Sequence, residues 1–291
     1  MDNQPTNSRD SVAVAKTVGI DWSCLSTAER IRYIELEGYA VLPGLLTTDQ
    51  IGQLKAETSA LPTTAVDYSP HQKTAKDVQW TDSPQVIRTI GLPAVVDFLT
   101  QLFGDELICT SVSYACSEPG HPGIALHTDS QPYGSKIFGD QASSPCLVRV
   151  LYYLDDLTTL CSPFKVIPRS HLSLHADAVP YHRYLSHDDE VMVTCQAGSA
   201  VIINQKVFHA NYPNYSDHNR RMLAIAYRPA WAGPIREVLD WVPDQVAQLP
   251  PDIQPFFQSL NTRRIDFDVP NRPENMALSA GGISPLRWKR V

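Results

Sequence analysis

Apolar positions in the first hundred residues recur at helical spacing, and the stretches begin with residues that start helices. Ser26 and Glu29 match a capping box, in which the two side chains cap each other's backbone, and this helix is expected to end near Gly38. A second helix is predicted over residues 47–61 and a third helical region over residues 83–103. The amino-terminal part of the chain is therefore predicted to be mainly helical.

From residue 106 onward the pattern changes to short runs of β-branched and aromatic residues separated by Gly, Pro, Asn and Asp. The predicted strands are residues 107–114, 147–154, 164–167, 191–195, 200–204 and 222–227. Several short strands at irregular spacing, with no helices alternating between them, are typical of an antiparallel sandwich or barrel. The fold class expected is mainly β with flanking helices.

These patterns predict a single domain after a loose terminus. Residues 1–20 are polar and lack periodicity. The domain would span residues 21–291, with a helical flank over 21–105, a β core over 106–231 and a proline-rich tail over 232–291 that wraps the core.

Composition and charge exclude some classes of function. The chain of 291 residues has a net charge of −7, which argues against nucleic-acid binding through bulk basicity and against a polybasic membrane patch. No apolar run approaches the roughly 18 residues of a membrane span, and the start lacks the pattern of a secretory signal. The six cysteines form no Cys-x-x-Cys pair, so we expect buried thiols in a reducing compartment and a cytoplasmic protein.

The first candidate chemistry lies at His127 and Asp129. They are two residues apart, so in a strand or its terminal turn both side chains point the same way. An imidazole and a carboxylate suit a borderline divalent metal, and two histidines with one carboxylate form the facial triad of non-haem Fe(II) oxygenases. A lone His-x-Asp sequence is a weak signal, because a pair on a surface loop gives the same pattern.

A second candidate region begins at His209, 82 residues further along the chain. His209 follows an apolar strand, and a turn then leads into a strand that starts with Arg220 and Arg221. If the two strands pair, an arginine lies near His209, and alternation lets only one of the two arginines face inward. A guanidinium inside a barrel is costly unless it binds an anion, and a dicarboxylic keto acid would provide one while its other end chelates a metal.

In order and spacing, these segments resemble the phytanoyl-CoA dioxygenase-like family of Fe(II)/2-oxoglutarate-dependent oxygenases. The core of that family is a double-stranded β-helix (jelly-roll, cupin-like). The matching segments are residues 37–46, 127–129, 162–171, 198–209 and 214–227. Three positions depart from the family pattern: Arg169 replaces a usual glycine, Ser199 a usual aspartate, and Leu126 a usual aromatic residue.

The resemblance implies a ligand set and cosubstrates. His127, Asp129 and His209 would bind Fe(II). Arg220, favoured over Arg221 by the family spacing, would bind the distal carboxylate of 2-oxoglutarate, and O2 would be the second cosubstrate.

Other residues near these segments are weaker candidates. Thr110, on the strand before the first ligand, could reach the cosubstrate. Residues that could contact the substrate are Gln131, Tyr133 and Arg149. His121, in a Pro-Gly-His-Pro loop, is expected to be solvated, and His171 is expected to be structural.

The activity expected is hydroxylation, or a related oxidation, of an unactivated C–H bond in a small molecule, with release of succinate and CO2. The carboxylate of Asp129 favours this over halogenation, because related halogenases carry a small residue there. The alternatives are a zinc hydrolase built on the same ligands and a non-catalytic jelly-roll binding protein. No basic cluster suits the phosphates of coenzyme A, so a natural-product-like substrate is favoured over an acyl thioester. The oligomeric state is left open.

Overall fold

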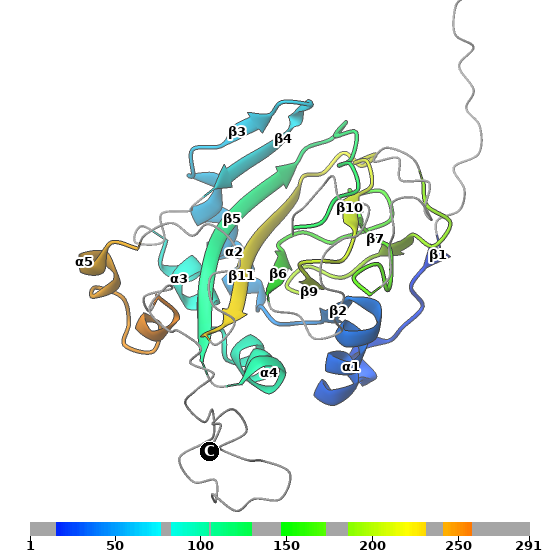
Figure 1. Cartoon of the computed structure of the whole chain (residues 1–291). Helices are drawn as coiled ribbons and strands as arrows, with labels where there is room; N and C mark the ends of the chain where they lie inside the picture. The colour runs from blue at the N-terminus through cyan, green and yellow to red at the C-terminus, as the bar shows by residue number, and fades with distance from the viewer. Residues whose placement is uncertain are drawn as a thin grey trace, which may run out of the picture.

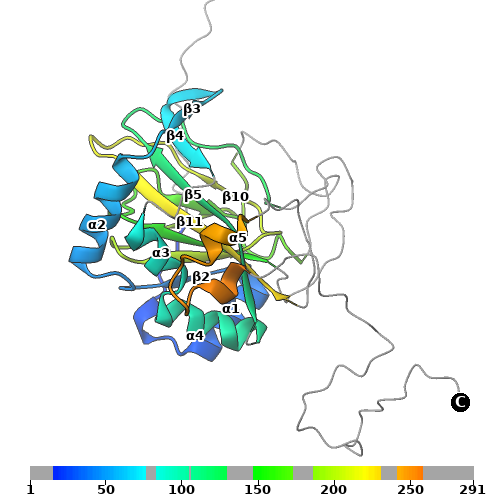
Figure 2. The same ribbon diagram turned by 90° about the vertical axis from the view of Figure 1, so that its left-hand side faces the viewer.

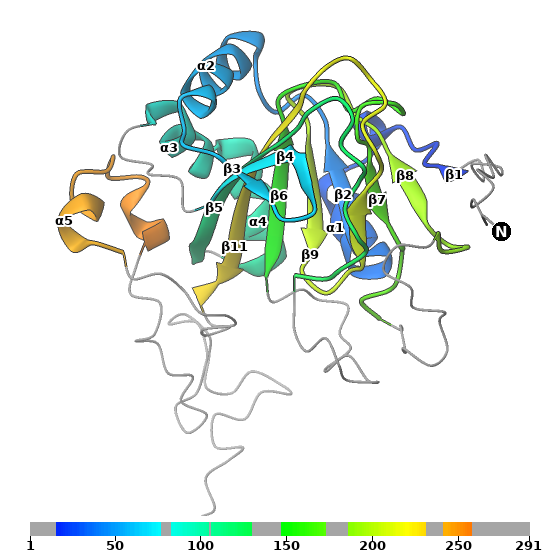
Figure 3. The ribbon, with the colours of Figure 1, turned by 90° about the horizontal axis from the view of Figure 1, so that it is seen from above.

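Two β-sheets form the centre of the protein. The computed structural model describes residues 16–76, 83–104, 106–129, 147–172, 186–230 and 241–257. Seen from above, the strands of the two sheets lie side by side (Figure 3). The larger sheet has the order β2-β9-β6-β11-β5-β4-β3, and the smaller has the order β1-β8-β7-β10. Every strand pair is antiparallel except the parallel pair of β1 and β8. The predicted mainly β fold is confirmed.

The strands fall where short apolar runs were predicted, with additions. The larger sheet comprises β2 (Tyr39–Leu42), β3 (Thr64–Val66), β4 (Ser69–Lys76), β5 (Leu107–Ser117), β6 (Val148–Tyr153), β9 (Ala200–Asn204) and β11 (Arg220–Pro229). The smaller comprises β1 (Lys16–Thr17), β7 (Phe164–Val166), β8 (Val191–Val193) and β10 (His209–Asn211). The hairpin of β3 and β4, which extends the larger sheet at one edge (Figure 1), was not predicted.

Helix-capping residues place the helices as expected. Helix α1 (Thr27–Glu37) begins at the Ser26–Glu29 capping box and ends at Gly38, whose φ of 86° is the left-handed conformation that favours glycine. Helix α2 (Thr48–Ser59) has a second capping box at Thr47. The other helices among the described residues are the 3-10 turns η1 (Trp22–Cys24) and η4 (Gln254–Phe257), with α3 (Pro84–Ile90), α4 (Pro93–Phe103) and α5 (Pro243–Val246). Helices α2, α3 and α4 lie on the outer side of the larger sheet (Figure 2).

Residues 84–103 belong to the core of this fold. By length and composition this segment could cross a membrane, and it is the one such segment among the described residues. It is divided into α3 and α4, because Gly91 ends the first helix and Pro93 starts the second. Val86, Ile90 and Leu99 are fully buried. We therefore assign the segment to the packing of helices on the sheet.

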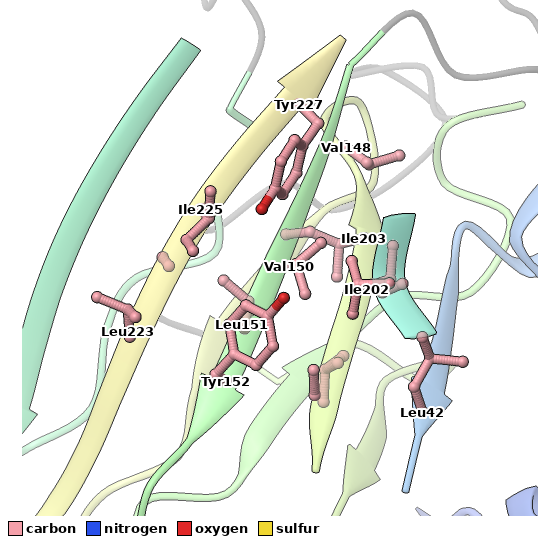
Figure 4. Close-up of a cluster of buried hydrophobic side chains, with 14 of the residues drawn as sticks. Leu42, Val148, Val150, Leu151, Tyr152, Ile202, Ile203, Leu223, Ile225 and Tyr227 are labelled. Atoms are coloured by element: carbon pink, nitrogen blue, oxygen red, sulfur yellow. The ribbon is translucent and has the colours of Figure 1, made fainter. Parts of the chain in front are cut away.

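The hydrophobic core lies between the helices and the larger sheet. Side chains of β6, β9 and β11 form its centre (Figure 4): Val150, Tyr152, Ile202, Leu223, Ile225 and Tyr227. Each fully buried Val, Leu or Ile contributes about 1.5–3 kcal/mol of transfer free energy. Successive residues of a strand face opposite sides, so the other faces of these strands are left to line a cavity between the two sheets. The carboxyl-terminal residues 241–257 add to the core, where Phe256 packs on Tyr227. The rest of the predicted tail and residues 1–15 lie outside the described residues.

Candidate metal centre

His127 and His209 are neighbours through their backbones. They form an antiparallel bridge, in which each backbone N–H donates to the other residue's carbonyl at 3.0 and 2.8 Å. The Asp129 N–H donates to the carbonyl of Gln205 at 2.9 Å and continues this pairing. The segment 127–129 is therefore held against the loop and strand that contain His209, although the two are far apart in sequence.

The three side chains converge. One ligand atom from each of His127, Asp129 and His209 lies within 4.8 Å of the others. The Nδ1 atoms of the two histidines lie 2.8 Å from the carbonyl of Ala125 and 3.0 Å from the carbonyl of Val207. Because Nδ1–H donates to a carbonyl, Nε2 of each ring is left with a lone pair for a metal.

The electrostatics of the site fit a cation. Burial, with a smaller contribution from His127, lowers the pKa of His209 to about 4, so this ring is neutral at pH 7 and able to bind a metal. Asp129 is paired with Arg149, whose Nε lies 2.8 Å from the carboxylate. Two neutral imidazoles and one carboxylate are a donor set that Fe(II) accepts, and the set leaves coordination positions for other ligands.

Arg220 is fully buried beside neutral partners. Its Nη2 donates to the hydroxyl of Ser117 at 2.6 Å, and the hydroxyl of Ser162 lies 3.5 Å away. With the Asn211 amide in the orientation that satisfies both of its polar atoms, Nη2 also donates to the amide oxygen at 2.5 Å. The ring of Tyr153 is 5.9 Å from the guanidinium. Within the part of the chain that the structure describes, no carboxylate pairs with Arg220. A buried guanidinium with only neutral partners is a site for an anion.

Arg221 faces the other side of β11. Its Nε and Nη2 donate to the carboxylate of Asp155 at 2.9 and 3.2 Å, and Lys55 pairs with the same carboxylate at 2.7 Å. Arg220 shares its face of the strand with Met222 and Ala224, which line the cavity. Alternation along β11 thus separates the two arginines.

A cavity of about 200 Å³ joins these groups. His127, Asp129, His209 and Arg149 line it, together with Asn211 and Met222, which touch Arg220. The β3–β4 hairpin forms a further wall through Val66, Tyr68, Gln72 and Thr74.

The structure places the weaker candidates differently. Arg149 lines the cavity, but its guanidinium is engaged with Asp129. Thr110 does not line it: this residue lies at a bulge of β5, and its hydroxyl donates to the carbonyl of Ala226 at 3.4 Å. Gln131 and Tyr133 lie outside the described residues.

His121 is not solvated, contrary to expectation. It is completely buried, because the loop that carries it is covered by the β3–β4 hairpin and by residues 211–214. His171 is buried too, and its Nε2 lies 2.9 Å from the carbonyl of Glu35 near the end of α1, which fits the predicted structural role. The Pro and Gly residues that flank His121 are typical of exposed loops, so the local sequence gave no sign that His121 is buried like His171.

Two histidines and a carboxylate converge between the two sheets, and their donor set matches that of the facial-triad class of non-haem metal sites. The profile of the phytanoyl-CoA dioxygenase (PhyH) family matches residues 34–222, and the chain belongs to this family. No curated protein matches the chain in sequence.

Solved structures share the fold. HygX from Streptomyces hygroscopicus, crystallised with nickel and 2-oxoglutarate, superposes with a TM-score of 0.62 at 16% identity over 76% of this chain and 94% of its own. The non-haem α-ketoglutarate-dependent epimerase SnoN of nogalamycin biosynthesis gives 0.58 at 17% identity, over 70% and 81%. The carbocyclase SnoK of the same biosynthesis gives 0.58 at 18% identity, over 72% and 86%. These likenesses confirm the predicted jelly-roll core.

Proposed function

We propose that the protein is a non-haem Fe(II)- and 2-oxoglutarate-dependent dioxygenase that oxidises a C–H bond of a small molecule and releases succinate and CO2. The observation that carries this proposal is the convergence of His127, Asp129 and His209 within 4.8 Å, with both Nδ1 atoms committed to carbonyls. Membership of the PhyH family supports the same cofactors.

The described residues divide the work of binding. His127, Asp129 and His209 would hold Fe(II), and Arg220 would hold the distal carboxylate of 2-oxoglutarate. The ferrous ion, with 2-oxoglutarate and O2, supplies the oxidising power for C–H cleavage. The chain itself orients the ligands through the backbone bridge of the two histidines, neutralises the dicarboxylate, and excludes water with the apolar walls of the cavity.

Arg220 favours this reaction over hydrolysis. A zinc hydrolase with the same three ligands would use metal-bound water and would give a buried guanidinium no role. The neutral surroundings of Arg220 cost stability unless a ligand carboxylate joins them.

The substrate that we propose is a small free metabolite. The cavity, about 200 Å³ among the described residues, has a mainly apolar wall with a few polar groups, the kind of lining that small-molecule sites have. Related folds bind such compounds: HygX has been crystallised with hygromycin B and SnoN with nogalamycin RO. SnoN is an epimerase and SnoK a carbocyclase, so proteins with this fold form different kinds of product. We therefore propose the cleavage of a C–H bond, and the product must be identified by experiment.

The test is formation of succinate from 2-oxoglutarate with Fe(II), O2 and ascorbate, in the presence of a panel of small metabolites screened for mass changes. We expect turnover by the wild type with Fe(II) and none with Zn²⁺. His127→Ala and Asp129→Ala should lose both turnover and bound iron, measured by metal analysis after gel filtration. Unchanged iron content in both variants, or turnover with Zn²⁺, would overturn the assignment.

A further inference from the structure

His121 is held in a fixed position by its own loop. Residues 118–121 form a tight turn, in which the N–H of His121 donates to the carbonyl of Glu118 at 3.0 Å. Pro119 and Gly120 occupy the central positions, and Gly120 has a φ of 83°, as the third residue of a type II turn requires. The carbonyl of His121 accepts from the N–H of Asn214 at 2.9 Å, so the backbone is anchored on both sides.

The imidazole of His121 has no hydrogen-bond partner among the described residues. The side chain is completely buried, and neither Nδ1 nor Nε2 is paired there. The ring of Tyr68, a cavity-lining residue, has its centroid 6.3 Å from that of His121. Buried polar groups are hydrogen-bonded in nearly all native structures, so a ring fixed in this way requires a partner that the described residues do not supply.

The missing partner of His121 must also be compatible with the positive charge of Arg220. Burial, then the charge of Arg220, then His71 lower the pKa of His121 to about 4. The ring is therefore neutral at pH 7 and has one N–H to donate. Printed contacts link the two residues: the carbonyl of His121 accepts from the N–H of Asn214, whose side-chain amide donates to the carbonyl of Ser117. The hydroxyl of Ser117 in turn accepts from Arg220, which also lacks an anionic partner among the described residues. A carboxylate bound by Arg220 on the side of His121 would accept a hydrogen bond from both side chains.

We propose that His121 is a positioning residue for 2-oxoglutarate, which donates its N–H to the distal carboxylate that Arg220 binds. This inference rests on the proposed function. A neutral donor beside the arginine adds a directed hydrogen bond without adding a second buried cation. His121 thereby selects a dicarboxylic keto acid over a keto acid with a single carboxylate.

The experiment compares two probes on protein loaded with Mn²⁺, a redox-inert substitute in this assay, by isothermal titration calorimetry. The probes are 2-oxoglutarate and 2-oxovalerate, which has the same chain length but lacks the distal carboxylate. His121→Phe keeps a ring of similar shape without donors, His121→Gln restores a donor, and His218→Asn changes an exposed histidine that precedes Arg220 by two residues.

We expect His121→Phe to weaken 2-oxoglutarate binding by about 10-fold or more, as loss of a hydrogen bond to a charged group does, and to leave 2-oxovalerate unaffected. His121→Gln should recover part of the loss, and His218→Asn should match the wild type. Equal binding of 2-oxoglutarate by His121→Phe and the wild type would overturn the proposal. An equal loss for both keto acids would also overturn it.

A second measurement applies if His121→Phe does not fold, as judged by circular dichroism. The imidazole signals of His121 in the wild type should shift in NMR spectra of the Zn²⁺-loaded protein on addition of 2-oxoglutarate and not of 2-oxovalerate. Identical responses to both would contradict the proposal. If the wild type binds neither keto acid, the proposed function itself fails, which separates that outcome from a failure confined to His121.

Discussion

Arg149 and Asp129 form an ion pair on the wall of the cavity, with Nε 2.8 Å from Oδ2. Arg149 lies on β6 in the larger sheet, whereas Asp129 belongs to the segment that is bridged to His209. The carboxylate that would bind the metal is therefore oriented by a residue from a third part of the chain. Removing a group that orients a metal ligand in this way typically weakens metal affinity by about 10- to 100-fold.

This pair predicts the effect of changing Arg149 on metal binding. Arg149→Leu should raise the Kd for Fe(II) by about 10- to 100-fold, as the loss of an outer partner of a metal ligand commonly does. Arg149→Lys keeps the charge and should lose less. Anaerobic titration with Fe(II) measures both. Tighter binding by Arg149→Leu would mean that the guanidinium opposes the metal rather than positioning its ligand.

Arg220 and Arg221 form a matched pair for testing cosubstrate binding. Arg220→Met should weaken 2-oxoglutarate binding by at least about 30-fold, since truncating one partner of a buried charge pair costs about 2–5 kcal/mol. Arg221→Met should leave that binding unchanged and cost about 1 kcal/mol of unfolding free energy, because Lys55 still pairs with Asp155. Calorimetry and thermal melts separate the two effects. A larger loss of binding in Arg221→Met would reverse the assignment.

His121 predicts a pH dependence of stability. Its pKa of about 4 in the folded protein lies below the ordinary value of 6.5, so unfolding at intermediate pH takes up a proton. The neutral His121 therefore contributes fully to the free energy of unfolding above pH 6.5, and this contribution is lost as the pH falls toward 4. Between pH 7 and pH 5 the metal-free wild type should lose on the order of 1 kcal/mol more than His121→Phe, a difference of about 2–4 °C in Tm. Parallel Tm curves for the two proteins would refute this.

The backbone conformation of Arg169 predicts a difference in stability between two substitutions at this position. It has a φ of 65°, in the left-handed region, where the family usually has glycine, and it pairs with Glu37 at 3.0 Å. Both variants lose the exposed ion pair with Glu37. Alanine at this position keeps the strain of the left-handed backbone conformation, whereas glycine removes that strain. The glycine variant should exceed the alanine variant by about 1 kcal/mol in unfolding free energy, measured by urea denaturation. No difference would show that the turn is unstrained.

Much of the fold was predictable because its signals are local. The capping box of α1 needs only Ser26 and Glu29, and the apolar runs of β6 and β9 are strands in any context where both faces are covered. The departure at Ser199 has little effect on the fold, since its hydroxyl accepts from the N–H of Gly44 at 3.3 Å and supports the same turn.

Other features depend on contacts between distant segments. The β3–β4 hairpin is polar and contains Pro70, and its strands exist because β4 pairs with the edge of β5. Thr110 lies at a bulge, where counting alternate residues fails to place a side chain. His121 is buried by segments from both earlier and later in the chain, so its own Pro-Gly surroundings gave the wrong prediction.

If Arg220 binds 2-oxoglutarate as proposed, its buried guanidinium links the lifetime of the protein to metabolism. A ligand that binds only the folded state raises its resistance to unfolding in proportion to the logarithm of the ligand concentration. With the function proposed above, a cell rich in the keto diacid protects the enzyme from heat and proteolysis. A cell starved of it leaves the guanidinium uncompensated, and the polypeptide is cleared sooner.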